Sequence, residues 1–361
     1  MAAGESLSDW LRLTLIPGIG GETQRKLLAA FGLPQAIFSA GHSAVRGVIG
    51  GKAASLLLDT DNQALVEQAC AWSAGDHQHI VTLADPDYPQ ALLEIPDPPT
   101  LLYVRGRLDL LNRPALAIVG SRNPTPQGLQ NAERFAAALA DAGLLIISGL
   151  ALGIDAAAHR GALSASAETV ALIGTGIDRI YPARNHDLAI EIGDKGSIVS
   201  EFPIGTPVTG ANFPRRNRLI SGMSRGVLVV EASTASGSLI TARLAGEQGR
   251  EVLAIPGSIH SPQARGCHQL IKQGAKLVES APDVLEELRF GTALQTVGRG
   301  SDNSAPNELL TMMGFDPCGL DELAARSGLT TDSLSVMLLH LELDGRIASL
   351  PGGRYQQLPD A

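Results

Sequence analysis

The middle of the chain alternates between short apolar runs and segments of helical periodicity, and this alternation constrains the fold most strongly. From Pro114 onward the apolar runs have the length of strands. Runs that are apolar on both faces are typical of parallel strands covered by helices on both sides. The sequence therefore predicts an α/β domain with a doubly wound parallel sheet. Its strands are expected at Ala115–Val119, Leu144–Ser148, Thr169–Ile173, Ser197–Ser200, Gly226–Glu231, Glu251–Ile255 and Lys276–Val278.

The chain is too long for this sheet alone. Its 361 residues exceed what one hydrophobic core usually serves, so two or three domains are expected. The prolines between Asp85 and Pro99 mark one boundary, and we assign residues 85–290 to the sheet domain. Residues 291–305 are rich in Gly, Ser, Thr and Asn without apolar periodicity, which predicts a flexible linker.

Residues 1–84 are predicted to form a small helical domain. Its helices are expected at Leu7–Leu15, at Glu22–Phe31 and at about Lys52–Ser73. Between the first two, Gly18 and Gly20 permit a tight turn, as in a helix-hairpin-helix, whose free N–H groups can hold a phosphate. We prefer a plain helix connection, because only two cations, Arg25 and Lys26, follow the turn and the segment is net negative.

Residues 306–361 are predicted to form a third domain. Its helices are expected at Glu308–Met313, Leu320–Ser327 and Thr331–Asp344, and a hairpin at Arg346–Leu350 and Arg354–Leu358. This order resembles a winged helix, which normally binds duplex DNA through its third helix. Here that helix carries Asp332, Glu342 and Asp344 and neither Lys nor Arg. A protein contact or plain packing is therefore the role that we expect.

The spacing of the cysteines indicates a reducing compartment, and the hydropathy of the sequence predicts no membrane-spanning segment. Cys70, Cys267 and Cys318 lie far apart without a C-x-x-C pair, which argues against a zinc site or a disulfide framework. The first residues lack a basic segment followed by an apolar one, and no stretch approaches the ~20 apolar residues that span a bilayer. We expect a cytoplasmic protein that binds neither a metal nor a membrane.

The net charge of −9 speaks against a nucleic-acid partner at face value, because phosphate binding needs clustered cations. The acidity is concentrated, however, in residues 291–361, which hold four basic and nine acidic residues. The segment Phe213–Arg225 carries four arginines and no Asp or Glu. The sequence thus predicts a local anion site on an acidic protein.

Glycine-bearing loops follow the first three predicted strands. Because the carboxyl ends of parallel strands share one edge of a sheet, we expect these loops to form one floor that suits a phosphate. The third loop continues into a Tyr-Pro segment that ends in an arginine and an asparagine. The residues expected at this floor are Gly120, Ser121, Arg122, Gly149, Leu150, Ala151, Arg184 and Asn185.

An arginine-rich loop leads into the helix after the fourth strand. It contains Phe213, Arg215, Arg216, Asn217 and Arg218. Cations at a helix N-terminus oppose the helix dipole, so they lose stabilisation unless an anion also binds there. The alternative is a solvated face, or internal ion pairs with Glu201 and Glu231. We favour anion binding for Arg215 and Arg216 and leave both interpretations open for Arg218.

The motifs occur in a characteristic order between Asp85 and Glu287. They are I-V-G-S-R, S-G-L-A-x-G-I-D-x-x-A-H, G-T-G-I-D-x-x-Y-P-x-x-N, S-E-F-P, F-P-x-R-N-R, V-V-E-A-x-x-x-S-G-S-L-I-T-A and I-P-G. This series resembles the DNA-processing protein A family. The resemblance implies an extended Rossmann-like domain that binds single-stranded DNA, forms a homodimer and loads the recombinase RecA on incoming DNA during natural transformation. It also implies accessory domains like the two predicted here.

Carried over by motif, the loop residues named above are expected to contact the DNA strand. Many members of the family have a lysine directly after Tyr-Pro, where this chain has Ala183 followed by Arg184. A longer arginine can reach the same phosphate. Tyr181, Phe202 and Phe213 are the aromatic residues that could stack on a base, although packing in the core is the expected role of Phe202.

Acid–base chemistry is not expected of this chain, and neither is a cofactor. Asp155 and His159 lie one helical turn apart, and we interpret both as structural. An alternative is a phosphoribohydrolase of the lysine-decarboxylase-like group, which the architecture also resembles. Those enzymes carry P-G-G-x-G-T-x-x-E, whereas Glu231 here precedes a Ser-Gly-Ser motif. A third reading is a scaffold without a working pocket, which the cations in several loops argue against.

Overall fold

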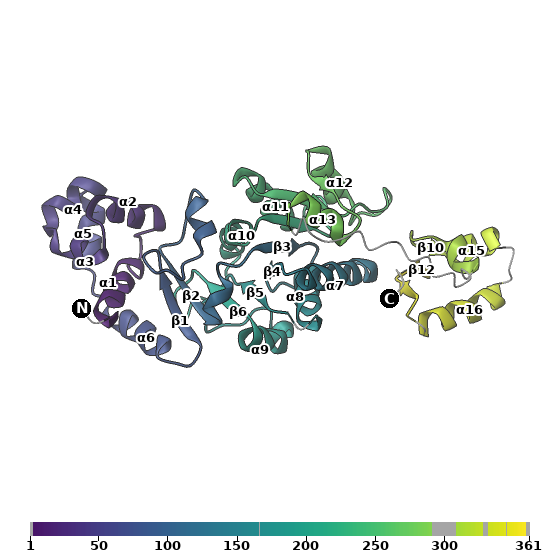
Figure 1. The fold of residues 1–361 in the computed structure, drawn as a ribbon, viewed down its shortest axis with the longest axis horizontal. Coiled ribbons are helices and arrows are strands. Elements are labelled where there is room, and N and C mark those ends of the chain that lie inside the picture. The colour runs from purple at the N-terminus through teal and green to yellow at the C-terminus, as the bar shows by residue number, and fades with distance from the viewer. Residues whose placement is uncertain (1–2, 166, 291–307, 328–330, 344, 359–361) are drawn as a thin grey trace.

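The computed structural model describes residues 3–165, 167–290, 308–327, 331–343 and 345–358. Within these ranges the chain forms a helical domain, then a large sheet with helices on both faces, and finally a small domain of helices and strands. The first and the last of these lie at opposite ends of the sheet domain (Figure 1).

The large sheet has nine strands in the order β1-β2-β6-β5-β4-β3-β7-β8-β9. From β6 to β9 neighbouring strands are parallel, which confirms the predicted α/β fold. All the predicted strands exist, with ends that shift by at most two residues. The strands are β1 Gln78–Thr82, β2 Leu101–Gly106, β3 Ala115–Val119, β4 Leu145–Ser148, β5 Thr169–Leu172, β6 Ser197–Ser200, β7 Gly226–Val229, β8 Glu251–Ala254 and β9 Lys276–Leu277.

Two antiparallel strands at one edge lie outside the predicted set. β2 pairs with β6, and β1 pairs with β2. The sheet therefore begins before residue 85, where we placed the start of this domain. β1 escaped prediction because it is the outermost strand, open on one side, and begins with the polar residues Gln78 and His79 instead of an apolar run.

Helices cover both faces of the sheet. One face carries α10 (Asn212–Gly222), α11 (Ser238–Glu247) and α12 (Arg265–Lys272). The other carries α7 (Pro126–Asp141), α8 (Ile154–Ser164), α9 (His186–Lys195) and α13 (Ala281–Glu287). The apolar strands alternate between these faces: on β3, Ala117 packs into the first core, and Leu116 and Ile118 pack into the second. Continuous apolar runs thus follow from burial on both sides.

The N-terminal domain consists of α1 Ala3–Thr14, α2 Gly21–Phe31, α3 Pro34–Ser39, α4 Gly41–Ile49, α5 Gly51–Asp59 and α6 Gln63–Ser73. The single helix predicted at Lys52–Ser73 is wrong, because the chain is extended at Thr60 and two helices result. The break is held by polar contacts. Asp61 Oδ1 accepts from the backbone N–H of Gln63, and Asn62 Nδ2 donates to the carbonyl of Arg12 on α1.

The C-terminal domain has the helices and the hairpin of a winged helix. Its elements are α14 Glu308–Met313, β10 Cys318–Gly319, α15 Leu320–Ser327, α16 Thr331–Leu343, β11 Ile347–Leu350 and β12 Arg354–Gln357. β10 was not predicted, and it adds a third strand by pairing with β12. Asp344 and residues 291–305 lie outside the described residues. Of the helices that the structure describes, none is long and apolar enough to cross a membrane.

His159 links α8 to the sheet from inside the core. Its side chain is fully buried, and Nδ1 lies 2.8 Å from Oγ1 of Thr169 on β5. Since Thr169 donates its own hydrogen to the carbonyl of Ile146, its oxygen accepts from the imidazole. Burial lowers the pKa of His159 to about 3, so the imidazole is neutral at pH 7.

This buried histidine predicts a loss of stability in mild acid. Below its ordinary pKa of 6.5 the unfolded chain binds a proton that the folded chain does not bind until about pH 3, so stability falls as the pH falls. Between pH 7 and 5 the free energy of unfolding should drop by about 2 kcal/mol through this residue. Urea unfolding at both pH values should show a smaller drop in His159→Gln. The exposed His42→Gln is the control, and an equal drop in all three proteins would contradict the argument.

Candidate nucleic-acid interface

A cavity of about 610 Å³ lies at the carboxyl edge of the sheet, lined by the loops that follow β3, β4 and β7 and by the start of α10. The structure thus brings together most of the loops that the sequence predicted. The predicted residues that line the cavity are Gly120, Ser121, Arg122, Ala151, Phe213, Arg216 and Asn217. The predicted residues outside its lining are Gly149, Leu150, Arg184, Asn185, Arg215 and Arg218.

Arg122 and Phe213 of the cavity lining form a row with the exposed Tyr181, which lies outside the lining. The guanidinium of Arg122 lies 5.6 Å from the ring centroid of Phe213, which in turn lies 5.8 Å from the ring of Tyr181. Arg122 is exposed and makes no ion pair within the part of the chain that the structure describes. A cation and accessible ring faces can hold a phosphate and a flat base respectively.

Arg216 lies inside the cavity wall and is buried, with 4% of its surface exposed. Its Nη1 donates to the carbonyl of Leu172, and it lies beside Asp155, whose Oδ2 accepts from the N–H of Gly149 at 3.1 Å. Burial lowers the pKa of Arg216 to about 10, while the charge of Asp155 acts in the opposite direction. A side chain at Gly149 would collide with both charged groups, so this close approach requires glycine. Arg216 therefore keeps its charge at pH 7 inside the wall.

The loop after β4 is held in place by Asn185. Its Nδ2 donates to the carbonyls of Leu150 and Ala151 at 2.9 and 3.1 Å, and the side chain is buried. Leu150 adopts a positive φ of 57°, which this side-chain contact supports. Asn185 therefore shapes the floor and does not itself line the cavity. Its neighbour Arg184 is exposed on the short helix before α9.

Gly120 and Ser121 form the turn between β3 and α7. A side chain at Gly120 would collide with Ile154 of α8 and with the backbone of Glu231, so the sheet edge is closed tightly here. The N–H of Ser121 donates to the carbonyl of Glu231 at 2.7 Å, and its hydroxyl accepts from the N–H of Asn123. The polar groups of this turn thus fix the loop that carries Arg122.

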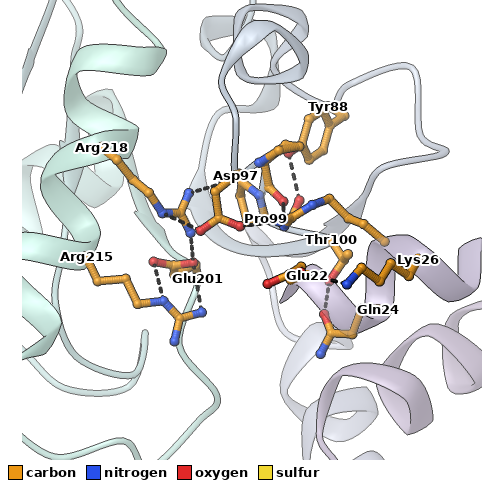
Figure 2. A network of polar contacts seen from close by, with 12 residues as sticks. Glu22, Gln24, Lys26, Tyr88, Asp97, Pro99, Thr100, Glu201, Arg215 and Arg218 are labelled. Carbon is orange, nitrogen blue, oxygen red and sulfur yellow. Dashed lines mark hydrogen bonds and ion pairs between the residues drawn. The ribbon is translucent and has the colours of Figure 1, made fainter. Parts of the chain in front are cut away.

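Arg215 and Arg218 do not line this cavity. Both bind Glu201, as Figure 2 shows. Glu201 is buried, and burial raises the pKa of its carboxyl while the two arginines lower it. Arg218 also pairs with Asp97. Of the two interpretations that we left open for Arg218, the structure shows the internal ion pair. Arg215 keeps half of its side chain exposed and lies over the ring of the buried Phe202.

A serine-rich wall of the cavity was not among the predicted site residues. It comes from the loop after β7 and the first turn of α11 and includes Ser233, Ser236, Ser238 and Thr241. The hydroxyls of Ser236 and Ser238 lie 2.7 Å apart. The sequence could have predicted this wall, because the loop after β7 leaves the sheet at the same edge as the glycine loops.

The carboxylates of Asp155 and Glu231, near the cavity, accept hydrogen bonds from backbone N–H groups and from one hydroxyl. Asp155 holds the loop after β4, in the first turn of α8 as expected. Glu231, considered above as an arginine partner, instead accepts from the N–H and the hydroxyl of Thr125 at the start of α7. Among the described residues, no group of three or more His, Cys, Asp or Glu side chains could hold a metal ion. The site as described therefore offers contacts for an anion and a base.

Comparisons with known proteins agree with this architecture. The family model described as DNA recombination-mediator protein A matches residues 79–289, and the DprA winged helix domain matches residues 299–353. Protein Smf of Escherichia coli is 42% identical over 300 residues, which cover 80% of each chain. The DNA processing protein DprA of Streptococcus pneumoniae is 48% identical over 209 residues, or 58% of this chain and 74% of that protein.

Two solved structures are similar as well. The crystal structure of DprA from Streptococcus pneumoniae superimposes with a TM-score of 0.69 at 36% identity, covering 80% of this chain and 98% of that chain. A structure of DNA processing protein A from Helicobacter pylori, reported for its mode of binding single-stranded DNA, gives a TM-score of 0.54 at 33% identity and covers 59% and 97% of the two chains. The two family matches and the identity to Protein Smf show that the chain belongs to the DNA recombination-mediator protein A (DprA/Smf) family.

Proposed function

We propose that this chain binds single-stranded DNA at the carboxyl-edge cavity without cleaving it. The observation that carries the proposal is the charge of the cavity. Among the described residues that line it, Arg122 and Arg216 are basic and Asp155 is the one acidic residue, which is already bound to backbone N–H groups. The cavity therefore has an excess of positive charge on a chain with a net charge of −9.

The shape of the site supports a single strand over a duplex. A splayed strand can place one phosphate on Arg122 and stack a base on Phe213 or Tyr181. A paired duplex keeps its bases stacked inside and cannot present a base to a cavity of about 610 Å³. The exposed Arg184 and Arg215 would line the path of the strand beyond the cavity, whereas Arg218 is engaged with Glu201 and Asp97.

We further propose that the protein passes the bound strand to RecA in the cytoplasm during natural transformation. Membership of a family of recombination mediators supports this step. A homodimer would align two cavities and raise affinity through effective concentration. We place its interface at the outer side of α11, the small-residue helix that borders a second cavity of about 740 Å³ with α12.

The protein should prefer single-stranded to double-stranded DNA with little dependence on base sequence. Filter binding of oligo-dT against a duplex of equal length tests this preference. Release of free base from AMP and CMP is measured on the same preparation, because the phosphoribohydrolase alternative requires that hydrolysis. Equal or tighter duplex binding would contradict the proposal, and base release would favour the enzyme.

Arg122→Ala should weaken oligo-dT binding by about 10- to 100-fold, because a charge-assisted phosphate contact is lost. The thermal midpoint should hardly change, since the side chain is exposed. Arg160→Ala on α8 is the matched control: it removes the same charge from an exposed arginine that pairs with Glu133. Arg215→Ala should cause a smaller loss than Arg122→Ala, because Glu201 already binds Arg215. If Arg122→Ala binds like the control, this residue does not contact the strand.

If the protein passes its bound strand to RecA, it should accelerate RecA-dependent strand exchange on a circular strand coated with single-strand-binding protein. The acceleration should disappear in the double variant Arg122→Ala/Arg215→Ala, because the mediator must hold the strand that it delivers. No acceleration at any ratio of protein to DNA would remove the mediator role and leave a strand-binding protein. Acceleration that survives in the double variant would place the mediator function outside the cavity.

A further inference from the structure

We propose that Asp97 is a positioning residue that couples the N-terminal helical domain to the DNA cavity through α10. The proposal rests on the single-strand binding proposed above. Asp97 lies in the connection from β1 to β2, which contacts α2 of the N-terminal domain, and it does not line the carboxyl-edge cavity. It acts through the arginines on either side of it.

Asp97 binds one arginine from each domain. Its Oδ1 lies 2.5 Å from Nη2 of Arg25 on α2, and its Oδ2 lies 3.3 Å from Nε of Arg218 on α10. Its backbone carbonyl also accepts from Nη1 of Arg218 at 2.7 Å. One residue therefore bridges a helix of the N-terminal domain and a helix of the sheet domain, as Figure 2 shows for the contacts to Arg218.

The residues that follow Asp97 strengthen this junction. The carbonyl of Pro98 accepts from Arg25 at 2.9 Å, and the carbonyl of Pro99 accepts from the buried hydroxyl of Tyr88 at 2.7 Å. Thr100 Oγ1 donates to Oε1 of Gln24 on α2 at 2.5 Å. Four consecutive residues are thus held by side chains, and the segment leads directly into β2. Because residues 97–100 are all held in place, a displacement of α2 can displace the residue that this segment contacts on α10, Arg218.

On the side of the sheet domain, residues 97–100 contact α10, the helix that forms part of the cavity wall. On α10, Arg215 and Arg218 face Glu201, while Phe213, Arg216 and Asn217 line the DNA cavity. Residues on one α-helix keep fixed positions relative to one another, so a shift at Arg218 moves the aromatic ring and the buried arginine as well. The N-terminal domain therefore acts on DNA affinity without touching the strand.

Asp97→Asn tests the coupling because two mechanisms predict opposite signs. If Asp97 acts only through its charge, removing a carboxylate near the path of the strand should tighten binding of the polyanion. If Asp97 positions α10, the loss of both arginine contacts should weaken oligo-dT binding by about 3- to 10-fold. Unchanged or tighter binding in a correctly folded variant would overturn the proposal.

Glu22→Gln is the matched control for Asp97→Asn. Glu22 and Asp97 both border a cavity of about 860 Å³ between the two domains. Glu22, however, pairs with Lys26 on its own helix and not with the sheet domain. It should leave the affinity unchanged or slightly raise it. Asp97→Glu should restore most of the affinity, because it keeps a carboxylate at this place. Arg25→Ala should weaken binding as Asp97→Asn does, and the double variant should be no weaker than either single variant.

Two measurements separate positioning from a direct DNA contact and from a failure of the proposed function. The salt dependence of oligo-dT binding should keep its slope in Asp97→Asn, because no phosphate contact is lost. Hydrogen exchange of the α10 amides, measured without DNA, should be faster in Asp97→Asn than in the wild type or in Glu22→Gln. Unchanged exchange in α10 would overturn the coupling even if the chain binds no DNA, whereas a wild type that binds no oligo-dT overturns only the proposed function.

Discussion

The burial of Arg216 against Asp155 is the interaction on which the cavity wall depends. A guanidinium taken out of water loses solvation that only neighbouring anions and acceptors replace. Asp155 and the carbonyl of Leu172 supply those partners, and the same carboxylate orders the N–H groups of Gly149 and Ala151. One carboxylate, that of Asp155, therefore faces the buried guanidinium and also holds the loop after β4.

Helix α10 serves two environments at once because of its periodicity. Arg215 and Arg218 are three residues apart and share a face, where both reach Glu201. Arg216 is turned by about 100° from Arg215 and about 160° from Arg218, into the wall of the cavity. The helix therefore joins the carboxyl-edge cavity to the ion pairs around Asp97. A cluster that is continuous in the sequence is divided in space into one arginine that lines the cavity and two that pair with Glu201.

The net charge of the chain is a poor guide to its proposed partner. Among the described residues that line the cavity, two are arginines and one is a carboxylate, Asp155, which is engaged with the backbone. Much of the acidity lies in residues 291–361, with nine acidic against four basic residues, beyond the sheet domain. Charge acts at short range in salt solution, so the local arrangement decides what binds.

The sequence by itself determined the parallel sheet, the edge at which its loops meet and the winged helix, because burial on both faces leaves a periodic apolar pattern. It also assigned Arg122 and Phe213 to loops at that edge, and the structure brings them 5.6 Å apart. Only the tertiary structure decided that β1 joins the sheet, since an edge strand needs no apolar run. It also decided that Arg216 is buried while Arg215 and Arg218 bind Glu201, and that the chain bends at Thr60. Each of these depends on partners distant in the sequence, and a local pattern carries no information about which distant partner a side chain will meet.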